Sequence, residues 1–306
     1  MRAGKGFSYR GVDGSTVTDP ETRERIEQLA IPPAWTDVWI SPYGNGHIQA
    51  TGTDAAGRTQ YIYHPAWRLQ KDRLKFDRAL ELAASLPAAR RAVTIDLRAA
   101  EPTSSRALAA AFRMLDTGLL RVGSERYADE HGSRGLSTLL CAHAGVSGDV
   151  VELGFPGKSG QEWRLELADP DLVAFVRVMK RRGSHARLLA WKDGRAWHPL
   201  NPADINGYVR ERTGGDFTSK DFRTLHGTVA AAVSLASAGP RKSPAARKRV
   251  VAQAAREVAE ALGNTPAIAR GSYIDPRVID RYERGGMLDP KATTSAESRL
   301  LDLLLE

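Results

Sequence analysis

Five short segments carry residue types that could act together on a phosphodiester. They are residues 120–127 and 219–228, each with an arginine, 155–160 with a lysine, 262–266 with an asparagine, and 271–276 with a tyrosine. Phosphoryl transfer without a metal ion needs fixed cations to meet the negative charge that builds up on the pentacoordinate phosphorus. It also needs a hydroxyl nucleophile placed in line and a proton donor for the leaving alkoxide. Arginine suits the first task because its guanidinium binds two oxygens at once.

Each segment by itself has an ordinary structural interpretation. An isolated arginine is usually solvated or salt-bridged, and a lysine in a turn is usually solvated. An asparagine before Thr-Pro is usually a helix cap, and a tyrosine beside a helix start usually packs with its hydroxyl in water. One segment alone therefore carries little weight.

Motifs of several other chemistries are missing from the chain. It contains no phosphate-binding P-loop, no Rossmann glycine motif, no H-E-x-x-H and no G-x-S-x-G. The single cysteine, Cys141, excludes an internal disulfide and a cysteine-rich zinc module. Cys141 lies in an apolar stretch that we expect to be helical, and we interpret it as a core residue. We expect no cofactor and no metal site.

The composition of the 306 residues is that of a basic globular protein. Lys plus Arg number 44 against 36 Asp plus Glu, a net charge of +8, and the isoelectric point is near 9.7. A value above about 9 is typical of nucleic-acid binders. No apolar run approaches the roughly 20 residues of a membrane span, and residues 1–10 lack the apolar core of a signal peptide. We therefore expect a cytoplasmic protein with no membrane partner.

The elements that must position these residues fall into two regions. In the first, Asp19-Pro20 predicts a helix start, and residues 38–40, 47–51 and 59–63 predict a small antiparallel sheet. A helical pattern follows over 67–86, and we expect Pro87 to end it. We place the boundary there, with an N-terminal β-rich domain over 1–82 and a catalytic domain over 83–306.

The second region is mainly helical. Helices are predicted over residues 104–118, 170–182, 202–213, 219–237, 244–262 and 294–305. Residues 150–155 and 162–167 predict a hairpin with Lys158 in its turn, and 188–191 with 195–198 predict a second hairpin. The predicted fold class is therefore α+β: a small antiparallel sheet domain, then a larger mainly helical domain with a small β-hairpin sheet.

Taken in order, these segments resemble the type IB DNA topoisomerases, in their compact bacterial and poxvirus-like branch. The resemblance covers nearly the whole chain. Its motifs are residues 31–35, 47–52 and 57–64 in the first region, and then Arg121-Val122-Gly123, Lys158 in its hairpin, residues 220–224, and Asn264-Thr265-Pro266 nine residues before Tyr273. The resemblance implies a catalytic domain of the kind that tyrosine recombinases and type IB topoisomerases share.

The resemblance also implies a role for each catalytic residue. Tyr273 matches the nucleophile that forms a 3′-phosphotyrosyl bond and releases a 5′-hydroxyl strand. Arg121 and Arg223 match the two arginines that stabilise the transition state. Lys158 matches the general acid that protonates the leaving 5′-oxygen. Because the covalent bond preserves the energy for resealing, no ATP is needed.

Two positions depart from the pattern of the viral relatives. Asn264 stands where many relatives have histidine; an amide donates a hydrogen bond but carries no proton, so its implied role is phosphate positioning. Leu225 stands where we expect an aromatic residue. The neighbouring His226 could share a helix face with Arg223, and we interpret it as structural.

The first domain of the family closes over the DNA duplex. Gln60, Tyr61 and Tyr63 match positions that meet DNA in viral relatives, and alternation places the two tyrosines on one strand face. The alternative is that these aromatics simply pack the sheet. Lys220 is a further expected contact with the DNA backbone or the scissile region.

The predicted function is relaxation of positive and negative supercoils by a type IB topoisomerase, acting as a monomer on double-stranded DNA in the bacterial nucleoid. Two alternatives stay open. A tyrosine recombinase shares the chemistry and the catalytic fold, but would act as a tetramer on paired sites. A non-catalytic DNA-binding protein would bind with a steep salt dependence and form no covalent adduct.

Overall fold

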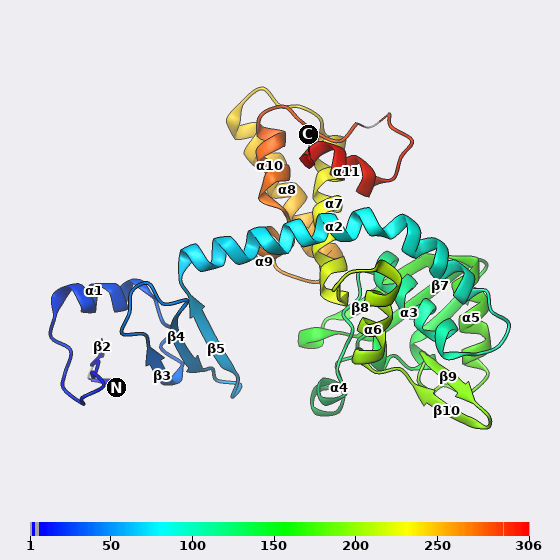
Figure 1. The fold of residues 1–306 in the computed structure, drawn as a ribbon, viewed down its shortest axis with the longest axis horizontal. Helices are drawn as coiled ribbons and strands as arrows, with labels where there is room; N and C mark the ends of the chain where they lie inside the picture. The colour runs from blue at the N-terminus through cyan, green and yellow to red at the C-terminus, as the bar shows by residue number, and fades with distance from the viewer. Residues whose placement is uncertain (1, 4–5, 290, 306) are drawn as a thin grey trace. The chain divides into compact units, whose positions relative to one another are not determined.

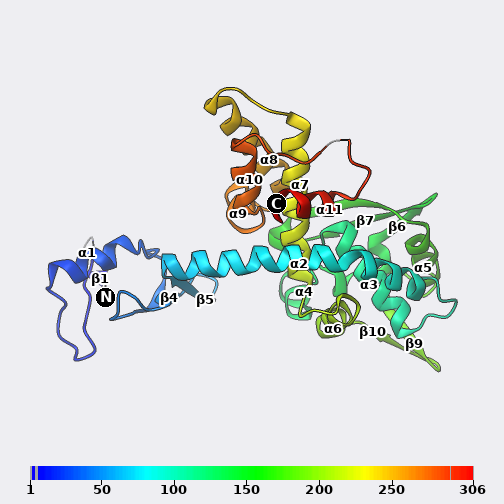
Figure 2. The same cartoon turned by 45° about the horizontal axis from the view of Figure 1, so that its top comes forward.

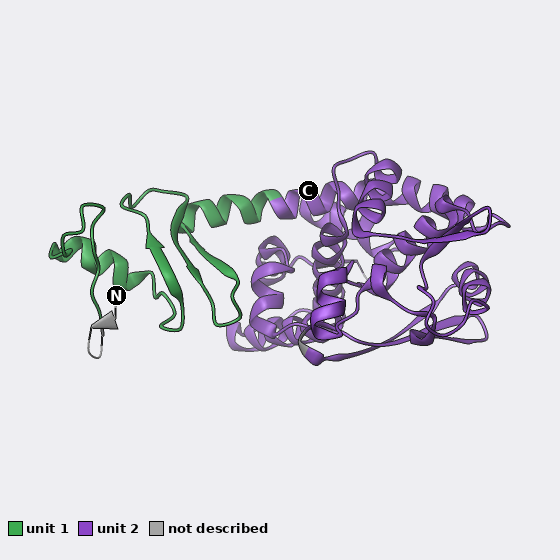
Figure 3. Cartoon of the chain, turned by 90° about the horizontal axis from the view of Figure 1, so that it is seen from below, with its two compact units in different colours: residues 1–74 green, residues 75–306 purple. Residues whose placement is uncertain are grey.

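The computed structural model describes residues 2–3, 6–289 and 291–305. The chain divides into two compact units, residues 1–74 and 75–306 (Figure 3). The division falls within one long helix, α2 (Pro65–Leu97), and the predicted boundary between residues 82 and 83 lies within the same helix. The assignment of a separate activity to each part stays a prediction.

The first unit contains the predicted small antiparallel sheet. Its elements are β1 (Arg2–Ala3), β2 (Gly6–Phe7), α1 (Pro20–Gln28), β3 (Thr36–Ile40), β4 (Ile48–Thr53) and β5 (Thr59–Tyr63). The strands β3, β4 and β5 pair antiparallel in chain order. Asp19 caps α1 as predicted, because its carboxylate accepts the backbone N–H of Thr22 at 2.8 Å.

The predicted end of α2 at Pro87 is wrong, because the helix continues to Leu97. A proline inside a helix costs about 3 kcal/mol. On both sides of Pro87, however, α2 buries apolar side chains completely, among them Leu82, Leu86 and Val93. Each such side chain contributes about 2 kcal/mol when buried, so packing outweighs the cost of the proline.

The second unit is mainly helical, as predicted (Figures 1 and 2). Its helices are α3 (Ser104–Gly118), α4 (Glu125–His131), α5 (Pro170–Lys180), α6 (Pro202–Thr213), α7 (Ser219–Ala238), α8 (Pro244–Leu262), α9 (Pro266–Ser272), α10 (Pro276–Glu283) and α11 (Ala296–Leu305). In the part of this unit that the structure describes, the 3₁₀ turns are η1 (Leu136–Thr138), η2 (Cys141–His143) and η3 (Lys158–Gly160). The sequence analysis gave no range for the short helices α4, α9 and α10, but its helix cap at residues 262–266 and its helix start beside Tyr273 agree with the starts of α9 at Pro266 and α10 at Pro276.

Both predicted hairpins are present. β7 (Val150–Pro156) pairs with β8 (Glu162–Ala168), and β6 (Ala144–Ser147), which was not predicted, adds a third strand beside β7. β9 (Ala190–Asp193) pairs with β10 (Ala196–Pro199). The stretch around Cys141 forms 3₁₀ turns rather than the expected helix, and Cys141 is buried there as predicted.

Two apolar clusters hold the second unit together. The larger one gathers side chains from the C-terminal part of α2, from α3, α5 and α7, and from the hairpin strands. The smaller one packs the end of α8 against α7 and α9 through Val258, Leu262, Ala269 and Ile274, with Tyr273 packed against it. The smaller cluster therefore positions the segment that carries Tyr273. Among the described residues, no helix is long and apolar enough to cross a membrane.

Candidate active site

Arg121 lies just beyond the C-terminus of α3, where Leu119 takes a left-handed conformation and turns the chain. The backbone of Gly123 crosses that of Gly135 so closely that a Cβ on Gly135 would lie 2.5 Å from the Cα of Gly123. The carbonyl of Arg121 also accepts the backbone N–H of Leu136 at 2.9 Å. The segment is therefore fixed against η1, and two glycines are needed for the close approach.

Arg223 lies in the second turn of α7 and is only 4% exposed. Its Nη2 donates to the carbonyl of Leu262, at the end of α8, at 2.7 Å. Its Nη1 donates to the carbonyl of Leu119, at the end of α3. Both acceptors lie at helix C-termini, where carbonyls lack partners within the helix. The side chain therefore joins three helices and is held in one orientation.

Asn264 follows the left-handed Gly263 that ends α8. Thr265, rather than Asn264, caps α9, since its hydroxyl accepts the backbone N–H of Ile268 at 3.3 Å. The Asn264 side chain is therefore available for another contact, and its Oδ1 accepts a hydrogen bond from Nη2 of Arg121 at 3.0 Å. Two residues that are far apart in sequence thus meet in the site.

Tyr273 ends α9, with its backbone N–H bonded to Ala269 at 2.9 Å. Its carbonyl accepts the hydroxyl of Thr228 on α7 at 3.1 Å. Gly227 allows this approach, because a Cβ there would lie 2.8 Å from the same carbonyl. The guanidinium carbon of Arg223 lies 5.3 Å from the centre of the Tyr273 ring. The structure therefore brings Arg121, Arg223, Asn264 and Tyr273 together.

The electrostatics of this cluster favour the binding of an anion. Burial, followed by the positive charge of Arg121, lowers the pKa of Arg223 to about 10, and contact with Tyr273 offsets part of that effect. Among the described contacts, neither Arg121 nor Arg223 is paired with a carboxylate. Nη1 of Arg121 is buried with no hydrogen-bond partner. A buried donor without a partner is costly, so a bound anion would stabilise both arginines.

Lys158 begins η3 at the tip of the β7–β8 hairpin and is exposed. The turn is tight, since the backbone N–H of Gly157 donates to the carbonyl of Gln161 at 2.7 Å. For the described residues, the structure shows no hydrogen bond or ion pair between the Lys158 side chain and the other four site residues. Its predicted role therefore rests on the position of the hairpin.

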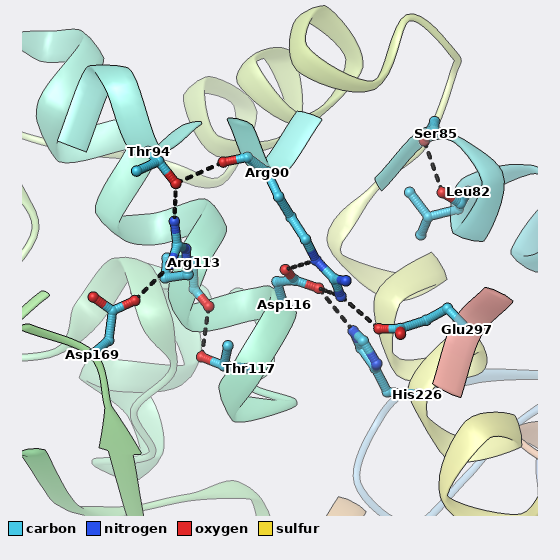
Figure 4. Close-up of polar contacts among 10 residues, drawn as sticks. All are labelled: Leu82, Ser85, Arg90, Thr94, Arg113, Asp116, Thr117, Asp169, His226 and Glu297. Atoms are coloured by element: carbon cyan, nitrogen blue, oxygen red, sulfur yellow. Dashed lines mark hydrogen bonds and ion pairs between the residues drawn. The ribbon is translucent and has the colours of Figure 1, made fainter. Parts of the chain in front are cut away.

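His226 lies one turn after Arg223 on α7 but contacts a different group (Figure 4). Its Nε2 is 3.1 Å from Oδ1 of Asp116, a carboxylate that Arg90 also binds through two nitrogens. Arg90 in turn pairs with Glu297 at 2.5 Å. These four residues, which we call the paired cluster, connect α2, α3, α7 and α11. His226 therefore has a structural contact.

In the first unit, the predicted DNA-contact residues fall on two faces. Tyr61 and Tyr63 are 49% and 44% exposed, and their rings stack with centres 6.0 Å apart, so they do not pack a core. Gln60 alternates to the other face and donates to Asp54 at 2.9 Å. Lys220, in the first turn of α7 in the second unit, is exposed.

Trp39 was missed by the sequence reasoning. It is 49% exposed, and it pairs across the sheet with Thr51, which pairs with Tyr61. Directly opposed residues share a face of the sheet, so Trp39, Tyr61 and Tyr63 form one exposed aromatic face. The alternation of β3 together with its strand pairing would have indicated this, but the pairing register was not available from the sequence.

Comparison with known proteins identifies the family to which the chain belongs. Residues 64–285 match the model of the "Eukaryotic DNA topoisomerase I, catalytic core", and residues 6–54 match that of the "Bacterial DNA topoisomerase IB, N-terminal domain". The chain therefore belongs to the type IB DNA topoisomerase family, and its function is that of a DNA topoisomerase, an isomerase that acts on DNA.

Full-length relatives support the same conclusion. The DNA topoisomerase 1B of Acanthamoeba polyphaga mimivirus is 31% identical over 291 residues, covering 92% of this chain and 86% of the relative. The DNA topoisomerase I of Monkeypox virus and the DNA topoisomerase 1B of Vaccinia virus (strain Copenhagen) are each 23% identical, covering 97% of this chain and 93% of the relative. These relatives are all topoisomerases, which favours that function over recombination or DNA binding alone.

Proposed function

We propose that Tyr273 cleaves one strand of duplex DNA and that the same site reseals it. The Tyr273 hydroxyl oxygen attacks the phosphorus, an Oη–P bond forms, and the bond from phosphorus to the 5′-oxygen breaks. The tyrosine proton passes to water, and the leaving 5′-oxygen gains a proton to become a hydroxyl. Resealing reverses each step, so the cycle consumes neither ATP nor a redox equivalent.

The observation that carries this proposal is the pair of arginines without carboxylate partners beside Tyr273. The transition state adds negative charge to the two non-bridging oxygens, and Arg121 and Arg223 offer fixed positive charge at that place. Hydrogen bonds already hold both guanidinium groups, so little reorganisation is needed when the phosphate arrives. Asn264 orients Arg121 through its Oδ1 and positions the phosphate.

Lys158 is the proposed general acid for the leaving 5′-oxygen. An exposed lysine on a tight hairpin tip can approach a bound duplex without disturbing the core. Its amine takes the proton back when the 5′-hydroxyl attacks the phosphotyrosyl bond. General acid catalysis of this kind contributes about 10²- to 10⁴-fold to a rate.

DNA contacts outside the site are proposed for both units. Tyr61 and Tyr63 would contact the duplex, with Trp39 extending the same aromatic face. Gln60 is proposed as a further contact from the opposite face of the strand. Lys220 would contact the backbone near the scissile phosphate. We assign residues 1–82 to a DNA clamp and 83–306 to a catalytic domain of the kind shared with tyrosine recombinases, acting as a monomer. We further propose that the protein acts in the bacterial nucleoid; the match to a bacterial N-terminal domain supports the bacterial setting.

The nicked strand can swivel about the intact one while the clamp holds the duplex. Torsional energy in positive or negative supercoils then drives rotation, and resealing traps a more relaxed topoisomer.

The test is relaxation of a supercoiled plasmid in EDTA without ATP, with wild type beside Tyr273→Phe. Wild type should give a ladder of topoisomers and a covalent 3′-adduct on short duplexes, and Tyr273→Phe should give neither. Tyr282→Phe is the matched control, because it also removes one hydroxyl, here bonded to the carbonyl of Gly239. Full relaxation by Tyr273→Phe would show that another residue is the nucleophile.

A further inference from the structure

Trp163, on β8 of the hairpin that carries Lys158, fills the space beside Gly157 at the hairpin tip. A Cβ on Gly157 would overlap the Cδ1 and Nε1 atoms of the indole. The backbone of Gly157 has a φ of −96°, which any residue can adopt. The indole, rather than the backbone conformation, therefore explains why glycine is needed at position 157. Gly157, the residue just before Lys158, is in direct contact with the indole ring.

The same indole packs on the segment that carries Asn264. A Cβ on Gly263 would lie 2.7 Å from Cζ2 of Trp163. Gly157 contacts the five-membered ring of the indole, and Gly263 contacts its six-membered ring. Trp163 therefore lies between the residue preceding Lys158 and the residue preceding Asn264.

A second connection joins the hairpin to the segment of Arg121. The carbonyl of Pro156, two residues before Lys158, accepts the backbone N–H of Arg134 at 2.7 Å. The next residue, Gly135, is the one that crosses Gly123 beside Arg121. With the bond from Arg121 to Asn264, these contacts form a closed ring through the three segments that carry Arg121, Lys158 and Asn264.

We propose that Trp163 is a positioning residue of the cleavage reaction: it holds the hairpin tip so that Lys158 reaches the leaving 5′-oxygen of a phosphate bound by Arg121 and Asn264. This inference rests on the proposed general-acid role of Lys158. Trp163 does not touch the reacting atoms in this account. Proton transfer depends steeply on distance, so displacing a general acid by about 1 Å can cost about 10²-fold in rate.

Trp163 packs on its surroundings at more than one place along the hairpin. At the base of the hairpin, Leu165 and Leu167 pack against Gly118 at the end of α3. Between that contact and Gly263 lies a cavity of about 350 Å³ whose lining includes Thr117, Leu119, Glu260 and Trp163 itself. Trp163 also stacks on the buried Phe155 of β7, with ring centres 6.4 Å apart, and packs against the larger apolar cluster. Loss of the indole should therefore displace the tip and also lower stability.

The first experiment measures single-turnover cleavage of a short duplex by Trp163→Ala. We expect a rate about 10²-fold below wild type with DNA affinity nearly unchanged. The rate is measured well below the unfolding temperature of the variant, because loss of the stacking on Phe155 lowers stability as well. The same variant is then given a duplex whose scissile 5′-bridging oxygen is replaced by sulfur. A thiolate leaves without a proton, so a defect in general-acid positioning should disappear on this substrate. Persistence of the full defect would overturn the proposal.

Lys158→Ala on the same two substrates separates this inference from the proposed function. Rescue of both variants by sulfur supports the two roles together. Rescue of Lys158→Ala alone rejects the role of Trp163 and keeps that of Lys158. If sulfur does not rescue Lys158→Ala, the general-acid assignment fails and the proposal for Trp163 fails with it. Trp163→Phe, which keeps an aromatic ring, guards against misfolding and should lose less activity than Trp163→Ala.

A glycine pair on the same hairpin provides a second test. Gly157→Ala should lower the cleavage rate by forcing the indole aside, whereas Gly154→Ala should not, because a Cβ on Gly154 meets nothing within 4 Å. In the Trp163→Ala background, Gly157→Ala should add little, since the clashing ring is gone. Equal losses from Gly157→Ala in both backgrounds would contradict a role that runs through the indole.

Discussion

Arginine side chains in the second unit occur in two different environments, one with carboxylate partners and one without. In the paired cluster, Arg90 lies between the carboxylates of Asp116 and Glu297, with His226 completing the network (Figure 4). In the active site, Arg121 and Arg223 contact an amide and two backbone carbonyls but no carboxylate among the described residues. In the paired cluster the protein itself supplies the carboxylates that neutralise the arginine. In the active site a bound phosphate would supply the negative charge.

The pKa values show the same difference. Hydrogen bonds and charge from Asp116 and Glu297 raise the pKa of Arg90 despite its burial. Burial and the nearby Arg121 lower the pKa of Arg223 to about 10. A depressed pKa means that the folded protein disfavours the charge on Arg223, and a phosphate would remove that cost. The two groups therefore differ in their partners: Arg90 is paired with carboxylates of the protein itself, whereas Arg121 and Arg223 lie beside Tyr273 without one among the described residues.

The largest expected effect concerns the active-site arginines, which have no carboxylate partners. Arg121→Ala should lower the cleavage rate by about 10³-fold, because one fixed donor to the transition state is lost. The free energy of unfolding should change by less than about 1 kcal/mol, since Arg121 makes one side-chain hydrogen bond, to Asn264. Single-turnover cleavage and urea unfolding on the same preparation measure both. A stable but fully active variant would remove Arg121 from the site.

Asp116→Asn should show the reverse pattern. It leaves Arg90 with one anion fewer and breaks the contact to His226 in a buried place, so we expect a loss of about 3 kcal/mol in the free energy of unfolding. The cleavage rate of the folded protein, measured well below its unfolding temperature, should stay within about 3-fold of wild type. A rate loss like that of Arg121→Ala would mean that the paired cluster takes part in catalysis.

Acid should weaken the paired cluster over a defined pH range. Contacts with His226 and Arg90 outweigh burial and lower the pKa of Asp116 from its ordinary 3.8 to about 2. The stabilisation is therefore fully present above about pH 4 and is lost as the pH falls toward 2. It amounts to about 2 kcal/mol, at 1.36 kcal/mol per pKa unit. Urea unfolding across this range should show the loss in wild type, and a smaller one in Asp116→Asn.

The smallest expected effect comes from the edge of the paired cluster. Glu297→Gln keeps a hydrogen-bond acceptor for Arg90 but removes the charge, and Asp116 stays in place. We expect a loss of about 1 kcal/mol in the free energy of unfolding and an unchanged cleavage rate. Protection of α11 amides from hydrogen exchange should fall more than that of α3, because Glu297 joins α11 to Arg90. Equal loss in both helices would argue against this local role.

Local signals in the sequence were sufficient for most elements. Cap residues and apolar spacing placed α3, α6 and α8 at their observed bounds, and the glycine-containing turns placed both hairpins. Pro87 misled the prediction because a local cost was weighed without the burial of Leu82 and Leu86, which depends on the rest of the fold. The strand β6 was missed because its pairing with β7 is a tertiary contact.

The sequence by itself determined the residue types of the site, their order along the chain and the family that this order resembles. Only the tertiary structure decided which of them meet. It placed Asn264 in contact with Arg121, and Arg223 in contact with Tyr273. It also placed His226 in contact with Asp116, although His226 is only three residues from Arg223. It also placed Trp163 between two glycines. The physical reason is that these contacts join segments far apart in the chain, so they depend on packing, which residue order alone does not specify.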